Sequence, residues 1–486
     1  MRDSTDELHI QQRSSATPLS GTLKQRSISV RCGLEATLSA LVLALLGPFA
    51  ALRARSVQKL LLGVVVLDIP LQLGTHFFYR EADASSGALG GLSISVTTIA
   101  LLALYTSWFL RRLERRGQEA RSSPQRNWAL VCYLGFSVLS LFVARDARLS
   151  AFELFFLLQM YLVFRYVAHF VRTRRDVLFV VSCILAGCLI ESLLMAGLGF
   201  GNVSTSLWGP LHIRVDHDAS GKFTRVGGTV GSPNEAGAYL SVVLSVAVSV
   251  LFVEVERKYK WLAAAVLAFG GAALVFTFSR GAWTAFVLAT ILFFFSTRLR
   301  KRISFKPLIP FAAILLFLYL PFHNEINNRL ISDDNGSAES RVPLMNLAFR
   351  MIADNPILGV GANNFSAAMA DYLTPEFRKG FLYTVHNKYL LVWSEIGPGG
   401  LLAYLAFFLG ILRVGRACWK QGDRFLSTLA LGMTVAMIGN MVHQSVEILQ
   451  DRGITQLLWL IAGLLVAMQE ILRAQTASFD LLASIT

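Results

Sequence analysis

"ERKYKWLAAAVLAFGGAALVFTFSRGAWTAFVLATILFFFSTRLRKR", residues 256–302, decides the fold class. Two apolar runs, at residues 261–279 and 282–297, are joined by almost nothing, and basic residues flank the pair at both ends. A helix that crosses a bilayer needs about 20 mostly apolar residues. The stretch therefore predicts two consecutive membrane helices, with a tight turn at Arg280 on one side and basic ends on the other.

The rest of the chain repeats this pattern. Of its 486 residues, 54% are hydrophobic and 16% are charged, which is more apolar surface than one soluble core can hide. Comparable apolar runs lie at residues 34–52, 57–77, 88–110, 128–144, 150–172, 178–200, 235–253, 307–321, 388–413, 425–445 and 454–472. We expect an all-α, polytopic membrane helix bundle of about 12 or 13 transmembrane helices, with an outward-facing, periplasmic helical loop domain.

The net charge of +14 has a membrane explanation. The basic residues cluster in short gaps between apolar runs rather than on one soluble face, which disfavours a nucleic-acid binder. If the helices alternate, the basic segments at 111–126, 172–176, 256–260, 297–306 and 413–424 all face the cytoplasm. The segments at 201–232 and 322–385 then face outward.

The domain boundaries follow from this topology. Residues 1–32 are predicted to be a disordered basic tail, and residues 33–321 hold membrane helices and the outward loop 201–232. Residues 322–385 form a periplasmic loop, 386–472 the last membrane helices and 473–486 a C-terminal tail. Basic residues on both sides of the run at 34–52 leave two options, either a tail on the outside or a re-entrant or interfacial run.

No metal or cofactor site is expected. The five cysteines fall in or beside apolar runs without disulfide or zinc spacing. His212, Asp216 and His217 resemble a metal cluster by composition, but Arg214 among them argues against one.

A glycine-rich motif, "RVGGTVGSPNEAGAYL" at 225–240, leads from an outward loop into a helix. Gly228 and Gly231 would let backbone amides approach an anion at the start of that helix, and Arg225 would add a forked phosphate clamp. Either Ser232 or Asn234 suits the helix cap. The alternative is a glycine-rich turn with a solvated arginine.

Arg280 stands out because the turn that holds it is so short. The tight connection must place this arginine at or within the membrane interface, where it binds an anion or snorkels to lipid headgroups. Gly281 beside it fits a close turn between helices.

A third motif is "HNKYLLVWSEIGPGG" at 386–400, which places His386 at the outer mouth of the bundle. If a helix began after Gly400, too few apolar residues would remain to span, so we expect one helix to run through the glycines. His386 and Gly397 would then share a face, since 11 residues are close to three turns. Small residues at 397 and 400 would admit a neighbouring helix, and Pro398 would bend the axis.

The outward loop before this motif contains an amphipathic pattern. Its apolar residues recur at helical spacing and are followed by "DNP", which stops a helix. They are Leu344, Leu347, Ala348 and Met351. Such a helix can lie on the bilayer and roof a lateral opening.

Together the motifs resemble the signature of the O-antigen ligase and polymerase family of bacterial envelope glycosyltransferases. The resemblance covers roughly residues 200–445 and includes the glycine-rich motif, "SRG" at 279–281, the "NPILGVGANNF" loop and the histidine motif. It implies that His386 acts as general base and that Arg225 and Arg280 bind a donor diphosphate. Supporting candidates are Arg341, Asn387 and Asn234, and the structural glycines are Gly228, Gly231, Gly281, Gly397 and Gly400.

The resemblance also implies the substrates and the location. The donor would be a glycan on undecaprenyl diphosphate, transferred without metal or nucleotide sugar at the periplasmic face of the inner membrane. The acceptor would be lipid A-core in a ligase or a lipid-linked glycan in a polymerase, and relatives use protein hydroxyls. A polysaccharide transporter or lipid-linked glycan flippase is the alternative from another class.

Overall fold

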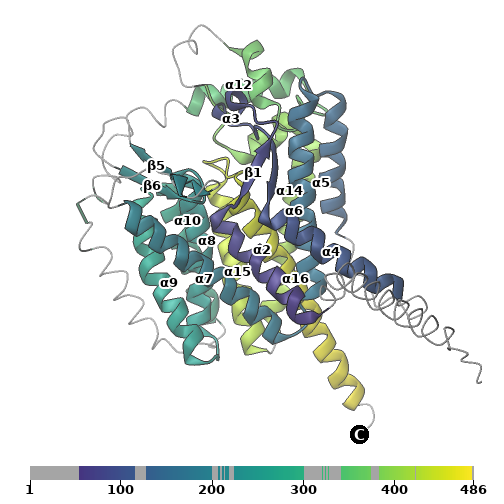
Figure 1. Ribbon diagram of the computed structural model, residues 1–486, viewed down its shortest axis with the longest axis vertical. Coiled ribbons are helices and arrows are strands. Elements are labelled where there is room, and N and C mark those ends of the chain that lie inside the picture. Colours follow the sequence, from purple (N-terminus) through teal and green to yellow (C-terminus); the bar gives the residue numbers. More distant parts are fainter. Residues whose placement is uncertain are drawn as a thin grey trace, which may run out of the picture.

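The computed structural model describes residues 54–114, 127–199, 206–207, 211–212, 214–217, 224–299, 320, 323–324, 327, 341–373, 382–421 and 423–483. Long helices dominate this part of the chain (Figure 1). The helices are α2 (Arg55–Leu71), α3 (Glu81–Ser85), α4 (Val96–Glu114), α5 (Trp128–Leu139), α6 (Ala147–Phe170), α7 (Arg174–Gly199), α8 (Pro233–Phe252), α9 (Arg257–Phe276), α10 (Arg280–Leu299), α12 (Arg341–Asp354), α13 (Phe365–Met369), α14 (Lys388–Lys420), α15 (Arg424–His443) and α16 (Arg452–Ala483). The 3-10 helices are η1 (Ser140–Phe142) and η2 (Ala370–Tyr372).

The predicted polytopic bundle is confirmed in its class. Eight helices of the described residues are long and apolar enough to cross a membrane, namely α6 to α10 and α14 to α16. Shorter apolar helices lie at Val96–Arg111 and Trp128–Phe142. The total of 12 or 13 stays a prediction, because the runs at 34–52 and 307–321 and the tail at 1–32 lie outside the described residues.

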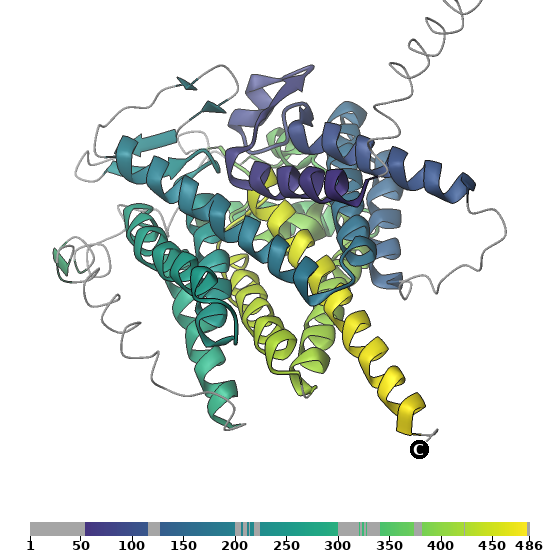
Figure 2. The same cartoon turned by 60° about the horizontal axis from the view of Figure 1, so that its bottom comes forward.

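The C-terminal helix is longer than expected. α16 continues to Ala483, through most of the segment assigned to a C-terminal tail. Its end projects beyond the other helices in both views (Figures 1 and 2). The apolar run that predicted the span is therefore only the first part of this helix.

Three short antiparallel strand pairs add to the helices. They are β1 (Gly74–Phe77) with β2 (Leu92–Ser95), β3 (Ser206–Leu207) with β4 (Leu211–His212), and β5 (Arg214–His217) with β6 (Thr224–Gly228). The first pair shortens two predicted spans, since the runs at 57–77 and 88–110 each give up residues to a strand. All-α is thus correct for the bundle but omits these strands.

A buried carboxylate explains where α2 ends and α4 begins. Asp68 accepts hydrogen bonds from the backbone N–H groups of Leu73 and Thr97 and pairs with Arg452 at 3.0 Å. A buried ion needs partners of this kind to offset its desolvation. The polar contacts therefore stop α2 short of the predicted length and join both helices to α16.

Two helices form the centre of the bundle. α8 and α15 are packed against each other and are each 83% buried over their apolar windows. A Cβ atom added at Gly432 of α15 would collide with the side chain of Ser249 in α8. Small residues thus let the two backbones approach closely, as is usual between membrane helices.

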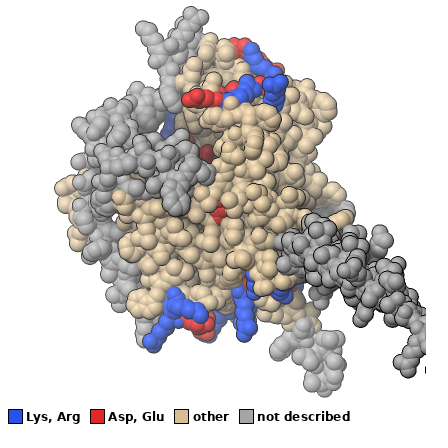
Figure 3. All heavy atoms as spheres, viewed as in Figure 1, with Lys and Arg blue, Asp and Glu red and all other residues tan. Residues whose placement is uncertain are grey.

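Charged residues gather mostly at the two ends of the molecule on the face drawn in Figure 3. Arg174 pairs with Asp423, Arg424 lies 3.5 Å from Glu254, and Lys59 lies 2.8 Å from Asp176. These contacts bring together, at one end of the bundle, basic segments that are far apart in sequence. The predicted alternation of the helices requires this grouping. The positive-inside rule favours this end as cytoplasmic, and that orientation stays a prediction.

The helix expected to run through the glycines is present as α14, but its helical geometry is interrupted rather than only bent. α14 is broken at Ile396 (φ −125°, ψ 15°) and Gly397 (φ 73°, ψ 177°). Pro398 lacks the N–H that an uninterrupted helix needs, and glycine alone accepts this backbone conformation readily. His386 and Gly397 therefore do not share a helical face.

The loop that follows α12 packs against the break in α14 and forms hydrogen bonds there. The backbone N–H groups of Val360 and Gly361 donate to the carbonyls of Ser394 and Glu395, both at 2.9 Å. A Cβ atom added at Gly397 would collide with the carbonyl oxygen of Ile357. Gly397 thus admits an outward loop, where a neighbouring helix was expected, and the loop satisfies carbonyls that the break releases.

Gly397→Ala is expected to destabilise the protein, because alanine is strained at this φ and its methyl group collides with the Ile357 carbonyl. The cost should be at least about 1–3 kcal/mol. The measurement is the midpoint of thermal unfolding in detergent. Gly410→Ala in the same helix is the control, since a Cβ atom there meets nothing within 4 Å; equal midpoints for the two variants would contradict the prediction.

Candidate functional site

Arg225 lies in β6 and reaches the turn between α9 and α10. Its Nε donates to the backbone carbonyl of Thr277 at 3.0 Å, and its Nη2 donates to Asn234 Oδ1 at 2.7 Å. Thr277 comes three residues before Arg280, the first residue of α10. Two arginines more than 50 residues apart in sequence are thus brought to one turn.

Gly281 follows Arg280 and contacts a buried histidine. A Cβ atom added at Gly281 would lie 2.5 Å from Cδ2 of His443, the last residue of α15. A side chain at this position would displace the imidazole. The glycine therefore permits a close approach between α10 and α15, which differs from the predicted role in the turn between consecutive helices.

His386 is held by a carboxylate. Its Nδ1 lies 2.7 Å from Glu447 Oε1, and its ring stacks on Tyr383 with centroids 5.4 Å apart. The His386 side chain keeps 23% of its surface exposed, whereas Glu447 keeps 9%. The imidazole is therefore fixed on one edge and accessible elsewhere.

Glu447 joins three parts of the chain. Besides His386, it accepts a hydrogen bond from Asn234 Nδ2 at its Oε2, at 2.6 Å. Burial alone would raise the pKa of Glu447. The hydrogen bond from His386 and the nearby charge of Arg341 help to outweigh burial, so that the pKa of Glu447 lies below its usual range.

Arg341 begins α12, the predicted amphipathic helix. The four expected apolar residues of this helix are buried, and the helix ends at Asp354 before the "NP" pair, so both predictions are confirmed. The charge of Arg341 acts on Glu447 and His443 across the outer end of the bundle. α12 thus brings a third cation toward the cluster.

Asn387 has a structural position. Its Oδ1 accepts from the backbone N–H groups of Tyr389 and Leu390, which makes it the N-cap of α14. Its Nδ2 donates to the carbonyl of Ser445 at 2.8 Å. These contacts hold the start of α14 against the segment that carries Glu447.

The glycine-rich loop binds carboxylates of its own chain. A Cβ atom at Gly228 would collide with Glu191 Oε1, and the next N–H, that of Thr229, donates to this oxygen at 2.8 Å. At Gly231 the nearest atom would be Asp451 Oδ2, again too close for a Cβ atom. The backbone of this loop approaches carboxyl groups of α7 and of the turn before α16, and the binding of a separate anion there stays a prediction.

The start of α8 follows one of the two predicted caps. Ser232 caps the helix in a reciprocal arrangement with Glu235, and Pro233 occupies the first turn. Asn234 is therefore not the cap. Its side chain is available for the contacts with Arg225 and Glu447.

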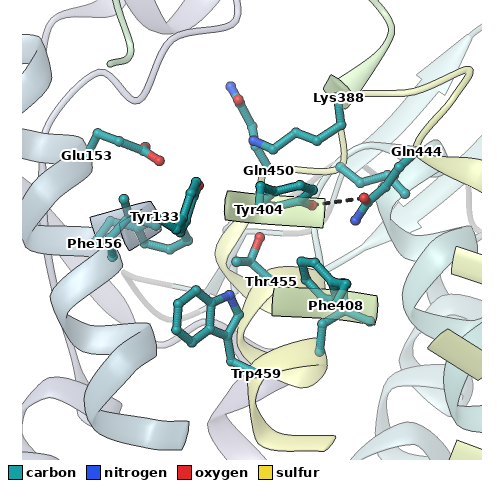
Figure 4. A pocket seen from close by; sticks show the side chains of 13 residues that line it. Tyr133, Glu153, Phe156, Lys388, Tyr404, Phe408, Gln444, Gln450, Thr455 and Trp459 are labelled. Atoms are coloured by element: carbon teal, nitrogen blue, oxygen red, sulfur yellow. Dashed lines mark hydrogen bonds between the residues drawn. The ribbon is translucent and has the colours of Figure 1, made fainter. Parts of the chain in front are cut away.

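A small cavity of about 30 Å³, with polar and apolar residues in its lining, adjoins this cluster. Glu153 of α6 and Lys388 of α14 approach it from opposite sides, above aromatic walls that include Trp459 (Figure 4). The Tyr404 hydroxyl donates to Gln444 Oε1 at its edge, at 2.9 Å. This volume suits one or two water molecules, whereas ligand pockets usually exceed about 300 Å³.

No cluster of three metal-ligating side chains occurs within the described part of the chain. The side chains of His212, Asp216 and His217 lie outside that part, so the expected absence of a metal there stays a prediction. Their backbone does place Asp216 opposite Arg225 in the β5–β6 pair.

Residues 263–405 match the family model described as O-antigen ligase. This match agrees with the family predicted from the motifs, and the eight helices long and apolar enough to cross a membrane agree with a multi-pass membrane protein. The matched segment includes Arg280, Arg341 and His386, whereas Arg225 and Glu447 lie outside it. A search of curated proteins gave no match.

Sequence reasoning did not include Glu447 among the site residues, whereas the structure shows its hydrogen bonds to His386 and Asn234. The available signal was an acidic residue just beyond the outer end of an apolar run. Sequence alone does not show which of several distant residues such a carboxylate meets.

Glu447→Gln is expected to lower stability at neutral pH but not in acid. The lowered pKa means that the folded state favours the ionised form, so this stabilisation is present above the unfolded value of about 4.3. It is lost as the pH falls through the lower, folded value. Thermal unfolding midpoints of both proteins from pH 7 to pH 3 should therefore converge at the acid end.

Glu254→Gln is the matched control. Glu254 lies at the opposite end, is 80% exposed and faces Arg424 at 3.5 Å, so little change is expected at any pH. A gap between wild type and Glu447→Gln that is as large at pH 3 as at pH 7 would contradict the assignment.

Proposed function

We propose that this member of the O-antigen ligase family transfers a glycan from an undecaprenyl diphosphate carrier to an acceptor hydroxyl at the periplasmic face of the inner membrane. The observation that carries the proposal is the cluster at one end of the bundle. There a partly exposed imidazole, backed by a buried carboxylate, lies beside segments that carry three arginines. The residues that build it come from five separate parts of the chain.

His386 is the proposed general base. An ionised carboxylate only accepts hydrogen bonds, so Glu447 holds a proton on Nδ1 and leaves the lone pair on Nε2. That nitrogen can accept the proton of an acceptor hydroxyl, and Glu447 stabilises the imidazolium that forms. The same arrangement of imidazole and carboxylate is used by other enzymes that activate a hydroxyl.

Arg225 and Arg280 are the proposed ligands of the donor diphosphate, with Arg341 as a further candidate. The acceptor oxygen forms a bond to the anomeric carbon while the bond from that carbon to the phosphate oxygen breaks. The electron pair leaves with undecaprenyl diphosphate, whose growing charge fixed guanidinium groups stabilise in the role a metal ion has elsewhere. Direct displacement from the opposite face inverts the anomeric centre.

The candidate acceptors offer the same reacting group to the enzyme. Lipid A-core and a lipid-linked repeat unit each present a sugar hydroxyl, and both need the same base and the same clamp. We propose an acceptor of this lipid-linked kind. The cavity beside Lys388 does not distinguish the two, because it is too small for a sugar ring.

His386→Ala is expected to lower transfer by about 10²–10⁴-fold, because the hydroxyl proton loses its acceptor. The assay uses purified lipid-diphosphate glycan with each acceptor, and donor binding is measured separately and should persist. His169→Ala is the control, since His169 lies at the opposite end beside Arg172. Full activity in His386→Ala would remove the proposed base, and movement of intact donor across vesicles without transfer would favour a flippase.

Arg280→Ala is expected to weaken donor binding and to lower transfer, whereas Arg280→Lys should retain part of both because it keeps the charge without the fork. Titration with the lipid diphosphate in detergent measures the affinity. Arg424→Ala, at an exposed position of the other end, serves as the matched control. Unchanged affinity in Arg280→Ala would contradict the diphosphate assignment.

A further inference from the structure

One side chain contacts both halves of the cluster. Asn234 accepts a hydrogen bond from Arg225 Nη2 through its Oδ1, at 2.7 Å, and donates one to Glu447 Oε2 through its Nδ2, at 2.6 Å. Glu447 in turn holds Nδ1 of His386 through its other oxygen, at 2.7 Å. The four side chains form one continuous series, from a proposed donor ligand to the proposed base.

The chemistry of the series requires at its centre a side chain that both accepts and donates hydrogen bonds. A guanidinium group only donates and an ionised carboxylate only accepts, so the residue between Arg225 and Glu447 must accept on one side and donate on the other. Asn234 does both with one planar group, and this fixes which atom faces which partner. An aspartate of the same shape would keep the first contact and lose the second.

The backbone of Asn234 is held in place independently of this series. Ser232, Pro233 and Glu235 fix the first turn of α8 through the reciprocal cap, and Asp451 donates its backbone N–H to Glu235 at 3.1 Å. The amide therefore projects from a rigid start of helix. The Asn234 amide can therefore restrain the positions of both Arg225 and Glu447, because its own position does not depend on theirs.

Both oxygens of Glu447 are occupied by this series. Oε2 receives Asn234 and Oε1 receives His386, on a carboxylate that is 9% exposed. A rotation of the carboxyl group that breaks one contact therefore breaks the other. The orientation of the imidazole depends on a contact made in another helix.

We propose that Asn234 is a positioning residue. It couples the position of the Arg225 side chain at the donor diphosphate to the orientation of the His386 imidazole. The inference rests on the proposed function and deepens it, because it makes donor binding and base alignment parts of one hydrogen-bonded frame. Asn234 contacts no reacting atom in this scheme. Its effect passes through Glu447 to the base and through Arg225 to the donor site.

The sharpest test is Asn234→Asp. The new carboxylate still accepts from Arg225 but faces Glu447 with like charge, so His386 loses its fixed orientation. We expect kcat to fall about 100-fold, the scale of a small misplacement of a catalytic group, with little change in the directly measured donor affinity. Asn234→Ala removes both contacts without new charge and should also lower kcat, and thermal unfolding confirms that each variant is folded.

The double variant Asn234→Asp with Glu447→Gln provides the rescue. The introduced glutamine can donate with its nitrogen to the carboxylate introduced at position 234 and accept from His386 Nδ1 with its oxygen, which restores the pattern with donor and acceptor exchanged. We expect it to regain about 10-fold in kcat over Asn234→Asp alone, as coupled partners do. A side chain that only fills space would give no such recovery.

Asn127→Asp is the matched control. Asn127 caps α5 by accepting from the backbone N–H of Leu130, a role that aspartate also fills, so wild-type kcat is expected.

Two outcomes would overturn the inference while leaving the proposed base intact. The first is a wild-type kcat in Asn234→Asp. The second is a double variant whose kcat is no higher than the value expected if the two single substitutions acted independently. An increase in donor KM alone would also reject the coupling, because it would assign Asn234 to the donor site only. Full activity in His386→Ala would instead reject the proposed function itself.

Discussion

The carboxylate of Glu447 is the interaction on which the site depends. It is almost fully buried at one end of the bundle and accepts hydrogen bonds from two parts of the chain that are far apart in sequence. A buried anion is tolerated only where such partners offset its desolvation. Because burial of the carboxylate is costly, Glu447 keeps its hydrogen bonds to Asn234 and His386. These hydrogen bonds in turn orient the His386 imidazole toward the surface.

The helix break at Ile396 and Gly397 has a comparable role in the fold. It releases backbone carbonyls inside the bundle, and the loop at 357–361 supplies the missing donors. Backbone without helical hydrogen bonds is acceptable at membrane depth only where protein covers it. The break thus anchors the outward loop, and with it α12 and Arg341, next to the start of α14.

Local sequence predicted the bundle class and most helix positions well, since apolar length and basic flanks act within one segment. It also located Arg280 and His386 at or next to helix starts, but it did not predict the strand that holds Arg225. It failed at the strands that shorten the early spans and at α14, where Pro398 was expected to bend a helix that instead breaks. Those features depend on Asp68 meeting Arg452 and on a loop meeting the break, which are contacts between distant segments.

By itself, the sequence indicated a polytopic helical membrane protein, a resemblance to the O-antigen ligase family and the residue types of the candidate site. These follow from composition, hydropathy and motif spacing, which are properties of single segments. Only the tertiary structure decided that Glu447 serves His386, that Asn234 joins it to Arg225, and that the glycine loop holds the chain's own carboxylates. Hydrogen bonds between residues 61 to 213 positions apart depend on how the helices pack, and no local pattern encodes that packing.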